Sequence, residues 1–159
     1  MNRILVALLF LSGCSSNLYL AGESNTLTPE QTVQKVFVTN AAQQPDEYAI
    51  LQQSGLYQFV AASETEHHLT LMPNTHIPMQ FEYSMLEVVG LGLIPVTYEY
   101  HDIFAYEMAY QGNVAEYRHT TPIVERVSIW ESLLTPFSDD RDTLIARGLL
   151  VSPPEVIAK

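Results

Sequence analysis

The side chains best suited to chemistry in this 159-residue chain are one cysteine, Cys14, and five histidines. The histidines are His67, His68, His76, His101 and His119. A metal site would need His67 and His68 to share one ion, but neighbouring residues of a strand point to opposite faces of a sheet. The chain also has no His-x-His or His-x-x-x-His spacing, which metal sites commonly use. We therefore expect neither a metal ion nor a cofactor.

Two other groups of residues invite a catalytic or binding interpretation. The run Ser138-Asp139-Asp140-Arg141-Asp142 carries the carboxylates of a calcium loop, but it lacks the central glycine and the distant glutamate of an EF-hand. A helix start capped by Ser138 or Asp139 explains it better. The chain has no Gly-x-Ser-x-Gly elbow, and its nearest fragment, Ser54-Gly55, is typical of a helix end. No catalytic residue can be assigned, and we expect no enzymatic activity.

The position of Cys14 is more informative than its thiol. It follows one positive charge, Arg3, an apolar run from Ile4 to Leu11, and two small residues. This order is typical of a secretory signal peptide, and the run is too short for a membrane span, which needs about 20 apolar residues. We expect residues 1–13 to be removed as a signal peptide. An ordinary secreted protein would leave the placement of its one cysteine unexplained.

The segment Leu11-Ser12-Gly13-Cys14 resembles the lipobox of bacterial lipoproteins. The resemblance implies cleavage before Cys14, acylation of its thiol and of the new amino terminus with chains such as palmitate, and membrane anchoring. In Gram-negative lipoproteins an Asp after the cysteine commonly signals retention in the inner membrane. Because Ser15 stands there, the resemblance implies the periplasmic face of the outer membrane if the source is Gram-negative.

The net charge of the chain limits its partners and the way it can attach to a membrane. The formal net charge is −11, which repels phosphate backbones and anionic headgroups, so we expect no nucleic acid as a partner. Membrane attachment must then come from acyl chains, each buried CH₂ contributing about 0.8 kcal/mol. We expect residues 14–31 to be the acylated cysteine and a flexible tether, residues 32–150 to form one domain, and residues 151–159 to be a disordered tail.

Within the domain, residue patterns predict strands over 33–39, 56–62 and 67–72 and a helix over 46–54. The order strand, helix, strand, strand, with Leu51-Gln52-Gln53-Ser54-Gly55-Leu56-Tyr57-Gln58-Phe59-Val60 at its centre, is similar to the N-terminal domain of the TolB translocation protein and to the curli-secretion lipoprotein family. That resemblance concerns about 40 residues and implies a fold only. A helix with one apolar face is predicted over residues 79–93.

The alternation of polar and apolar residues from Val96 to Tyr110 predicts a long strand, and Val114 to Thr121 its hairpin partner. A type II′ turn at Gly112-Asn113 would place Glu107 opposite Arg118. We expect a short helix over 128–134 with Trp130, Leu133 and Leu134 turned inward. A last helix over 140–147 should end at Gly148.

The fold class predicted from these elements is α+β, an antiparallel sheet with helices packed on one face, preceded by the signal peptide and tether. We expect a membrane-anchored envelope lipoprotein that acts as a protein-interaction or assembly module, with another envelope protein as partner. The alternative is a periplasmic module that binds a small ligand or glycan. A large apolar pocket lined by Tyr98, Tyr100 and Phe104 would favour the alternative, and a flat exposed apolar patch would favour the interaction module.

Overall fold

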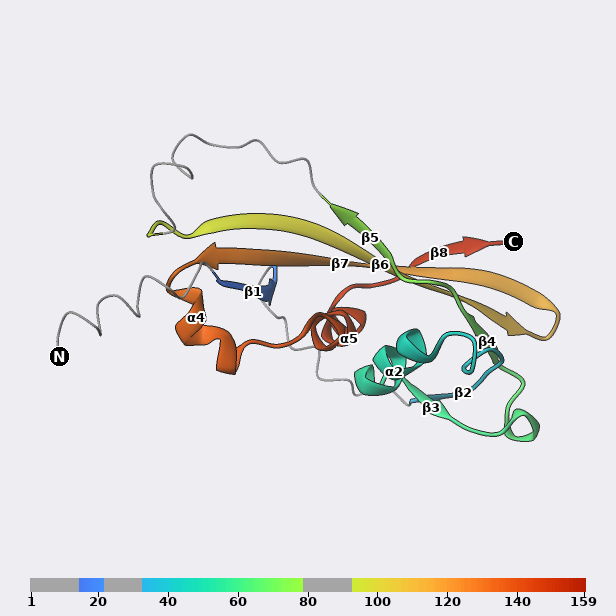
Figure 1. Cartoon of the computed structure of the whole chain (residues 1–159). Coiled ribbons are helices and arrows are strands. Elements are labelled where there is room, and N and C mark those ends of the chain that lie inside the picture. The colour runs from blue at the N-terminus through green and yellow to red at the C-terminus, as the bar shows by residue number, and fades with distance from the viewer. Residues whose placement is uncertain (1–14, 22–32, 79–92) are drawn as a thin grey trace.

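The computed structural model of the chain describes residues 15–21, 33–78 and 93–159 (Figure 1). The first part of the chain contains β1 Ser15–Leu20, β2 Gln34–Val38, α2 Pro45–Ser54, β3 Tyr57–Phe59, the 3₁₀ turn η1 Ala62–Glu64, β4 His68–Leu71 and β5 Thr75–Pro78. The second part contains β6 Val96–Tyr110, β7 Asn113–Ser128, α4 Glu131–Leu134, the 3₁₀ turn η2 Thr135–Phe137, α5 Arg141–Val151 and β8 Glu155–Ala158. The helix predicted over residues 79–93 lies outside the described residues except for Leu93.

The strands form one mixed, curled sheet in the order β1-β7-β6-β4-β2-β3, with β5 paired to β6 and β8 to β7. The α+β class is confirmed, but the antiparallel prediction is only partly right, because β2 runs parallel to both β3 and β4. Parallel neighbours need a crossover connection, and α2 supplies it between β2 and β3. Figure 1 shows α2, α4 and α5 on the same side of the β6–β7 hairpin.

The long hairpin is present, but its predicted register is wrong by two residues. Glu107 lies opposite Glu116, and Arg118 lies opposite Ala105. The reason is the turn, where Gln111 and Gly112 both have positive φ, 49° and 83°. Two consecutive positive φ values are the mark of a type I′ turn, which fits the twist of a hairpin. A shift of two residues leaves every side chain on its predicted face.

The aromatic face of β6 is the core side of the sheet. Phe104, Tyr106 and Met108 are buried on it against α2 and α5. The helices contribute buried aliphatic side chains, namely Ile50, Leu51, Leu144, Ile145 and Leu149. Burial and the neighbouring Tyr57 raise the pKa of Tyr106 far above its usual range. Around Phe104, Tyr106 and Met108 the aromatic face of β6 is therefore core and not a platform for a ligand.

The helix ends combine confirmed and wrong predictions. Gly55 follows α2 in the left-handed conformation, with φ 66°, as predicted. An acid before the apolar residues, Asp46, is predicted from the sequence to cap the start of α2. This prediction is wrong, because the helix starts at Pro45 and Gln44 precedes it. The predicted cap of the last helix, Ser138 or Asp139, is wrong, because Asp140 caps α5 by accepting a hydrogen bond from the Thr143 amide. This helix continues past Gly148, which is a packing residue and not the stop.

The expected tether and tail both contain strands. Residues 15–20 form β1, which pairs with Ile123–Ser128 of β7, and residues 155–158 form β8, which pairs with Ala115–Arg118. On the β7 edge that β6 leaves open, β1 pairs with six residues and β8 with four. A fully unpaired edge of 16 residues would be an aggregation hazard. Both strands are short, with six and four residues, and each lies beside a stretch without periodicity, which concealed their role in the sequence.

Candidate functional site

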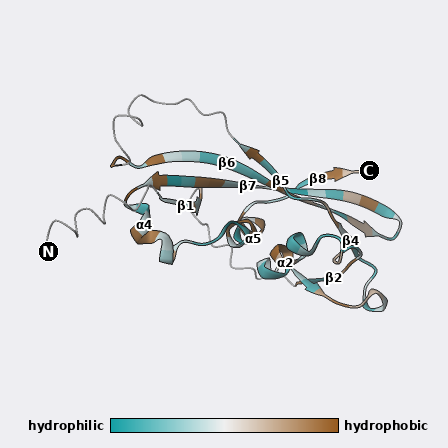
Figure 2. Ribbon diagram, viewed as in Figure 1, coloured by the Kyte–Doolittle hydropathy of each residue, from teal (hydrophilic) through white to brown (hydrophobic). Residues whose placement is uncertain are grey.

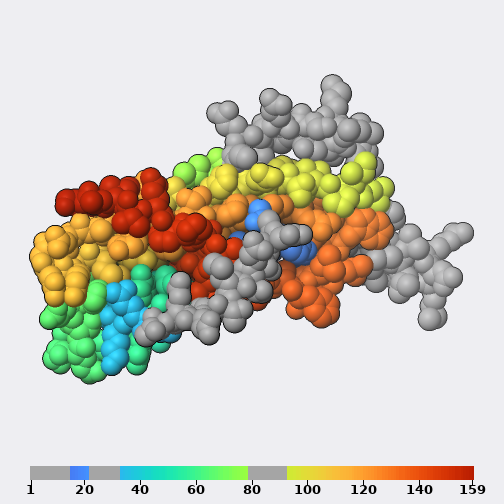
Figure 3. Space-filling model, turned by 180° about the vertical axis from the view of Figure 1, so that it is seen from behind, coloured from blue at the N-terminus to red at the C-terminus, as the bar shows by residue number. Residues whose placement is uncertain are grey.

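One end of the hairpin brings the start of the described chain next to α4. Ser15 of β1 pairs with Ser128, the last residue of β7, and Val96 at the start of β6 pairs with Val127. The hydroxyl of the buried Ser128 accepts hydrogen bonds from the amides of Trp130 (3.2 Å) and Glu131 (3.3 Å). These bonds turn the chain out of β7 and into α4. In Figure 3 the blue atoms of β1 lie among orange atoms of residues around 120–140.

The side chain of Glu131 points into the protein and joins α4 to β1. It is only 1% exposed, and its carboxylate accepts hydrogen bonds from the Asn17 amide and the Tyr19 hydroxyl, each 2.8 Å long. Arg126 forms an ion pair with it at 3.4 Å. A buried carboxylate is stable only with such partners. Burial and the bond to Glu131 also raise the pKa of Tyr19.

Because Glu131 faces inward, the apolar residues of this segment face outward. The prediction that Trp130, Leu133 and Leu134 are buried is therefore wrong. Six of the ten large hydrophobic side chains exposed in the described residues belong to two short segments, 93–94 and 130–137. We call these six the apolar end: Leu93, Ile94, Trp130, Leu133, Leu134 and Phe137. Figure 2 shows hydrophobic colour on α4 at this end of the hairpin.

The two segments of the apolar end are joined to each other. The Trp130 indole donates a hydrogen bond to the backbone oxygen of Leu93 at 3.0 Å. Phe137 is the most exposed of the six, at 85%. Between Ile129 and Ser138 the one ionisable residue is Glu131, whose carboxylate is buried. The surface is therefore apolar and carries no charge of its own along these ten residues, in a chain with 25 charged side chains.

A second candidate is a hollow of about 200 Å³ midway along the hairpin. Asp102, which lines the hollow, is buried and accepts two hydrogen bonds from Arg141. His76 Nδ1 lies 2.9 Å from the same carboxylate. Hydrogen bonding to Asp102 raises the pKa of Arg141. Tyr100 donates to Glu125 across the hollow, and burial together with that bond raises the pKa of Tyr100 to about 12. These charges satisfy one another and tie β5, β6 and α5 together.

The residues singled out in the sequence are not brought together. Cys14 lies outside the described residues, one peptide bond before Ser15. His67 stacks on Tyr110, and His68 packs edge-on against Phe37. The Nδ1 atom of buried His119 is hydrogen-bonded to the backbone oxygen of Ser152 at 3.0 Å, and its Nε2 atom lies 3.4 Å from the Tyr106 hydroxyl. Within residues 15–21, 33–78 and 93–159 no three His, Cys, Asp or Glu side chains are arranged to hold a metal ion.

The run from Ser138 to Asp142 contains a helix start, as predicted, and its charged residues also form ion pairs. Asp140 caps α5, which lowers the pKa of its carboxyl through the bonds to Thr143, and Asp139 pairs with Arg147 at 2.5 Å. Sequence reasoning missed the contact between Asn17 and Glu131. The one signal in the sequence was Glu131, an acid in a segment with no other charge. Its partner Asn17 belongs to β1, which the sequence analysis had assigned to the tether.

Two comparisons with known proteins found no match for the chain. No family model matches it, and no curated protein matches it significantly. Among the described helices, none is both long enough and apolar enough to cross a bilayer.

Proposed function

We propose that this chain is an envelope lipoprotein, acylated at Cys14 and held at the periplasmic face of a bacterial outer membrane, whose domain binds another envelope protein. The proposal joins the lipobox resemblance to one structural observation. The residue after Cys14 is paired into one end of a long hairpin, and the α2 and β2–β4 body is attached to the other end. The anchor and the body are therefore separated by a long stretch of the paired hairpin.

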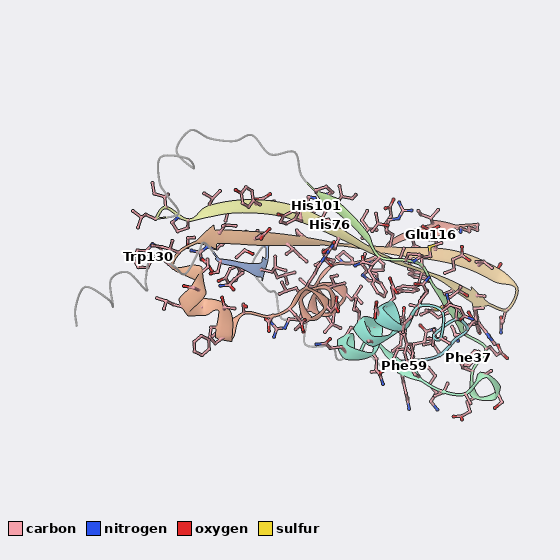
Figure 4. All side chains as sticks on the ribbon, viewed as in Figure 1. Phe37, Phe59, His76, His101, Glu116 and Trp130 are labelled. Atoms are coloured by element: carbon pink, nitrogen blue, oxygen red, sulfur yellow. The ribbon has the colours of Figure 1, made fainter. Side chains whose placement is uncertain are left out.

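The separation follows from the strand register. Ser15 pairs with Ser128, close to the pair of Val96 and Val127, whereas β4 pairs with residues 106–109 of β6. About ten residues of β6 lie between these points, which at ~3.4 Å per residue is at most about 34 Å. Figure 4 shows Trp130 at the opposite end of the molecule from Phe37, Phe59 and Glu116. A sheet of this kind would carry the body at a fixed reach from the membrane.

Interaction is better supported than binding of a small ligand or glycan. Phe104 is fully buried, so it cannot line a ligand pocket with Tyr98 and Tyr100. The hollow beside Tyr100 is smaller than the 300–1,000 Å³ typical of ligand sites, and its charged groups already pair with one another. The molecule instead exposes the six large hydrophobic side chains of the apolar end, as expected of a protein that works through surface contacts rather than through a ligand pocket.

Two measurements test this proposal separately. Mass spectrometry of the amino-terminal peptide should find acyl chains on Cys14, and Cys14→Ala should abolish both processing and membrane retention. A photo-crosslinking residue at Gln52 or Gln58, both exposed on the body, should then capture an envelope protein in cells. An unmodified Cys14 in a membrane-retained protein would contradict the anchor. Turnover of a substrate by the purified domain would contradict the binding role.

A further inference from the structure

We propose that the apolar end is a membrane-contacting surface, so that the domain stands on the bilayer by these side chains in addition to its acyl chains. This inference rests on the proposed acylation of Cys14 and adds a second contact with the same membrane. The partner of the surface is the phospholipid bilayer itself, and the contact is made by Leu93, Ile94, Trp130, Leu133, Leu134 and Phe137.

The place where the chain leaves the described structure argues for this partner. Cys14 is bonded to Ser15, so their Cα atoms lie about 3.8 Å apart. Ser15 is in register with Ser128, and Ser128 lies two residues before Trp130. Acyl chains on Cys14 would therefore enter the bilayer next to the apolar end. No flexible spacer separates the two, because β1 starts at Ser15.

The chemistry of the surface fits the boundary between headgroups and acyl chains. Tryptophan is enriched at that boundary because its ring is apolar and its N–H is polar. Trp130 is 52% exposed, and Leu133 and Phe137 are more exposed still. The carboxylate of Glu131, which would oppose insertion, is turned inward to Asn17 and Tyr19. At the apolar end the protein therefore presents apolar groups to a membrane, although the chain as a whole is strongly acidic.

One exposed apolar side chain of β8 lies far from the apolar end. Val156 of β8 is as exposed as Leu93, but β8 pairs with Ala115–Arg118 near the turn of the hairpin. Along β7, Tyr117 opposite Val156 is 11 residues from Ser128, a distance of at most about 37 Å at ~3.4 Å per residue. Val156 is therefore a matched control, since the proposal places it away from the bilayer.

Fluorescence of Trp130 tests the contact directly, because the chain has one tryptophan. The acylated protein is purified and reconstituted in vesicles of phosphatidylethanolamine and phosphatidylglycerol, with and without bromine on the acyl chains. We expect a blue-shifted emission that brominated lipid quenches. Phe137→Glu and Leu133→Glu should stay anchored and fold as before, because both side chains are exposed, but they should lose most of the shift and the quenching. Val156→Glu should behave as the unmodified sequence.

The outcomes separate this inference from the proposed function. Acylated protein that stays on the vesicles with an unquenched, water-like Trp130 emission would overturn the membrane contact and leave the anchor intact. A blue shift without quenching that grows with protein density would also overturn it, because a second copy would then cover the surface. Equal quenching in Phe137→Glu and Val156→Glu would show that anchoring alone brings Trp130 to the lipid, and would overturn it as well.

Discussion

The amide of Asn17 donates one hydrogen bond to the carboxylate of Glu131 and another to its backbone oxygen, each 2.8 Å long. Both side chains are almost completely buried, although 114 residues separate them in the sequence. This contact attaches the first strand to the helix that bears Trp130. It also determines which face of α4 is exposed. Because the Glu131 side chain points into the protein, Leu133 and Leu134 face the solvent.

Asn17→Ala should therefore destabilise the domain. The substitution removes two buried hydrogen bonds and leaves part of the Glu131 carboxylate without a donor, which should lower the free energy of unfolding by about 2–4 kcal/mol. Urea unfolding of the chain from Ser15 onward measures it, and Gln58→Ala, at the exposed residue of β3, is the control. An unchanged midpoint for Asn17→Ala would show that the contact contributes nothing.

A second prediction concerns the close approach of α5 to β7. A Cβ added at Gly148 would lie 2.2 Å from the Thr121 hydroxyl oxygen, so Gly148→Ala should destabilise the domain by about 1–3 kcal/mol despite the higher helix propensity of alanine. Thr121→Ala removes the two nearest atoms. The double variant should recover part of the loss, which a double-mutant cycle of unfolding free energies would show as coupling. Additive effects would mean that the two residues do not touch.

The Gly148 contact also illustrates what the sequence could reveal. Local patterns predicted β2, α2, β4 and both strands of the hairpin, because periodicity and turn residues report on the chain within a few positions. The sequence does not reveal which element a glycine approaches. Gly148 after Arg147 is typical of a helix end, and its tertiary role depends on Thr121, which is 27 positions away in the chain.

The candidate site was concealed for a similar reason. The pattern around Trp130 predicted an inward apolar face, and that prediction assumed that acids point to water. Glu131 reverses it through partners on β1, a strand with no signal in the sequence beyond the short alternation of Asn17, Leu18 and Tyr19. The hairpin register failed because Gln111 adopts positive φ, which is uncommon outside glycine, asparagine and aspartate.

A pH-dependent stability is expected from His119. Burial lowers the pKa of its imidazole below 6.5, against a weaker opposing effect of the bond to Ser152. As the pH falls below 6.5 the unfolded chain binds the proton first, so stability that is present above this pH is lost on acidification. His119→Gln, which can still donate to Ser152, should make urea midpoints less sensitive to acid. His101→Gln serves as the control, and an equal effect of both would refute the assignment.

The last prediction distinguishes a strand from a tether at residues 15–20. Deletion of Ser15–Leu20 removes Asn17 and Tyr19 from Glu131 and exposes the edge of β7. Loss of these partners of a buried carboxylate should lower the free energy of unfolding by at least about 3 kcal/mol. A flexible tether would give no such loss, so an unchanged urea midpoint would contradict the pairing of β1 with β7.

A matched insertion separates the two roles of this segment. Glycine and serine residues inserted between Cys14 and Ser15 keep β1 and its bonds to Glu131, so the unfolding midpoint should not change. The insertion lengthens the connection to the acyl chains and so lowers the effective concentration of the apolar end at the lipid surface. We expect weaker quenching of Trp130 by brominated lipid in proportion to the inserted length. Quenching independent of length would mean that the apolar side chains hold the domain on the bilayer without help from the anchor's position.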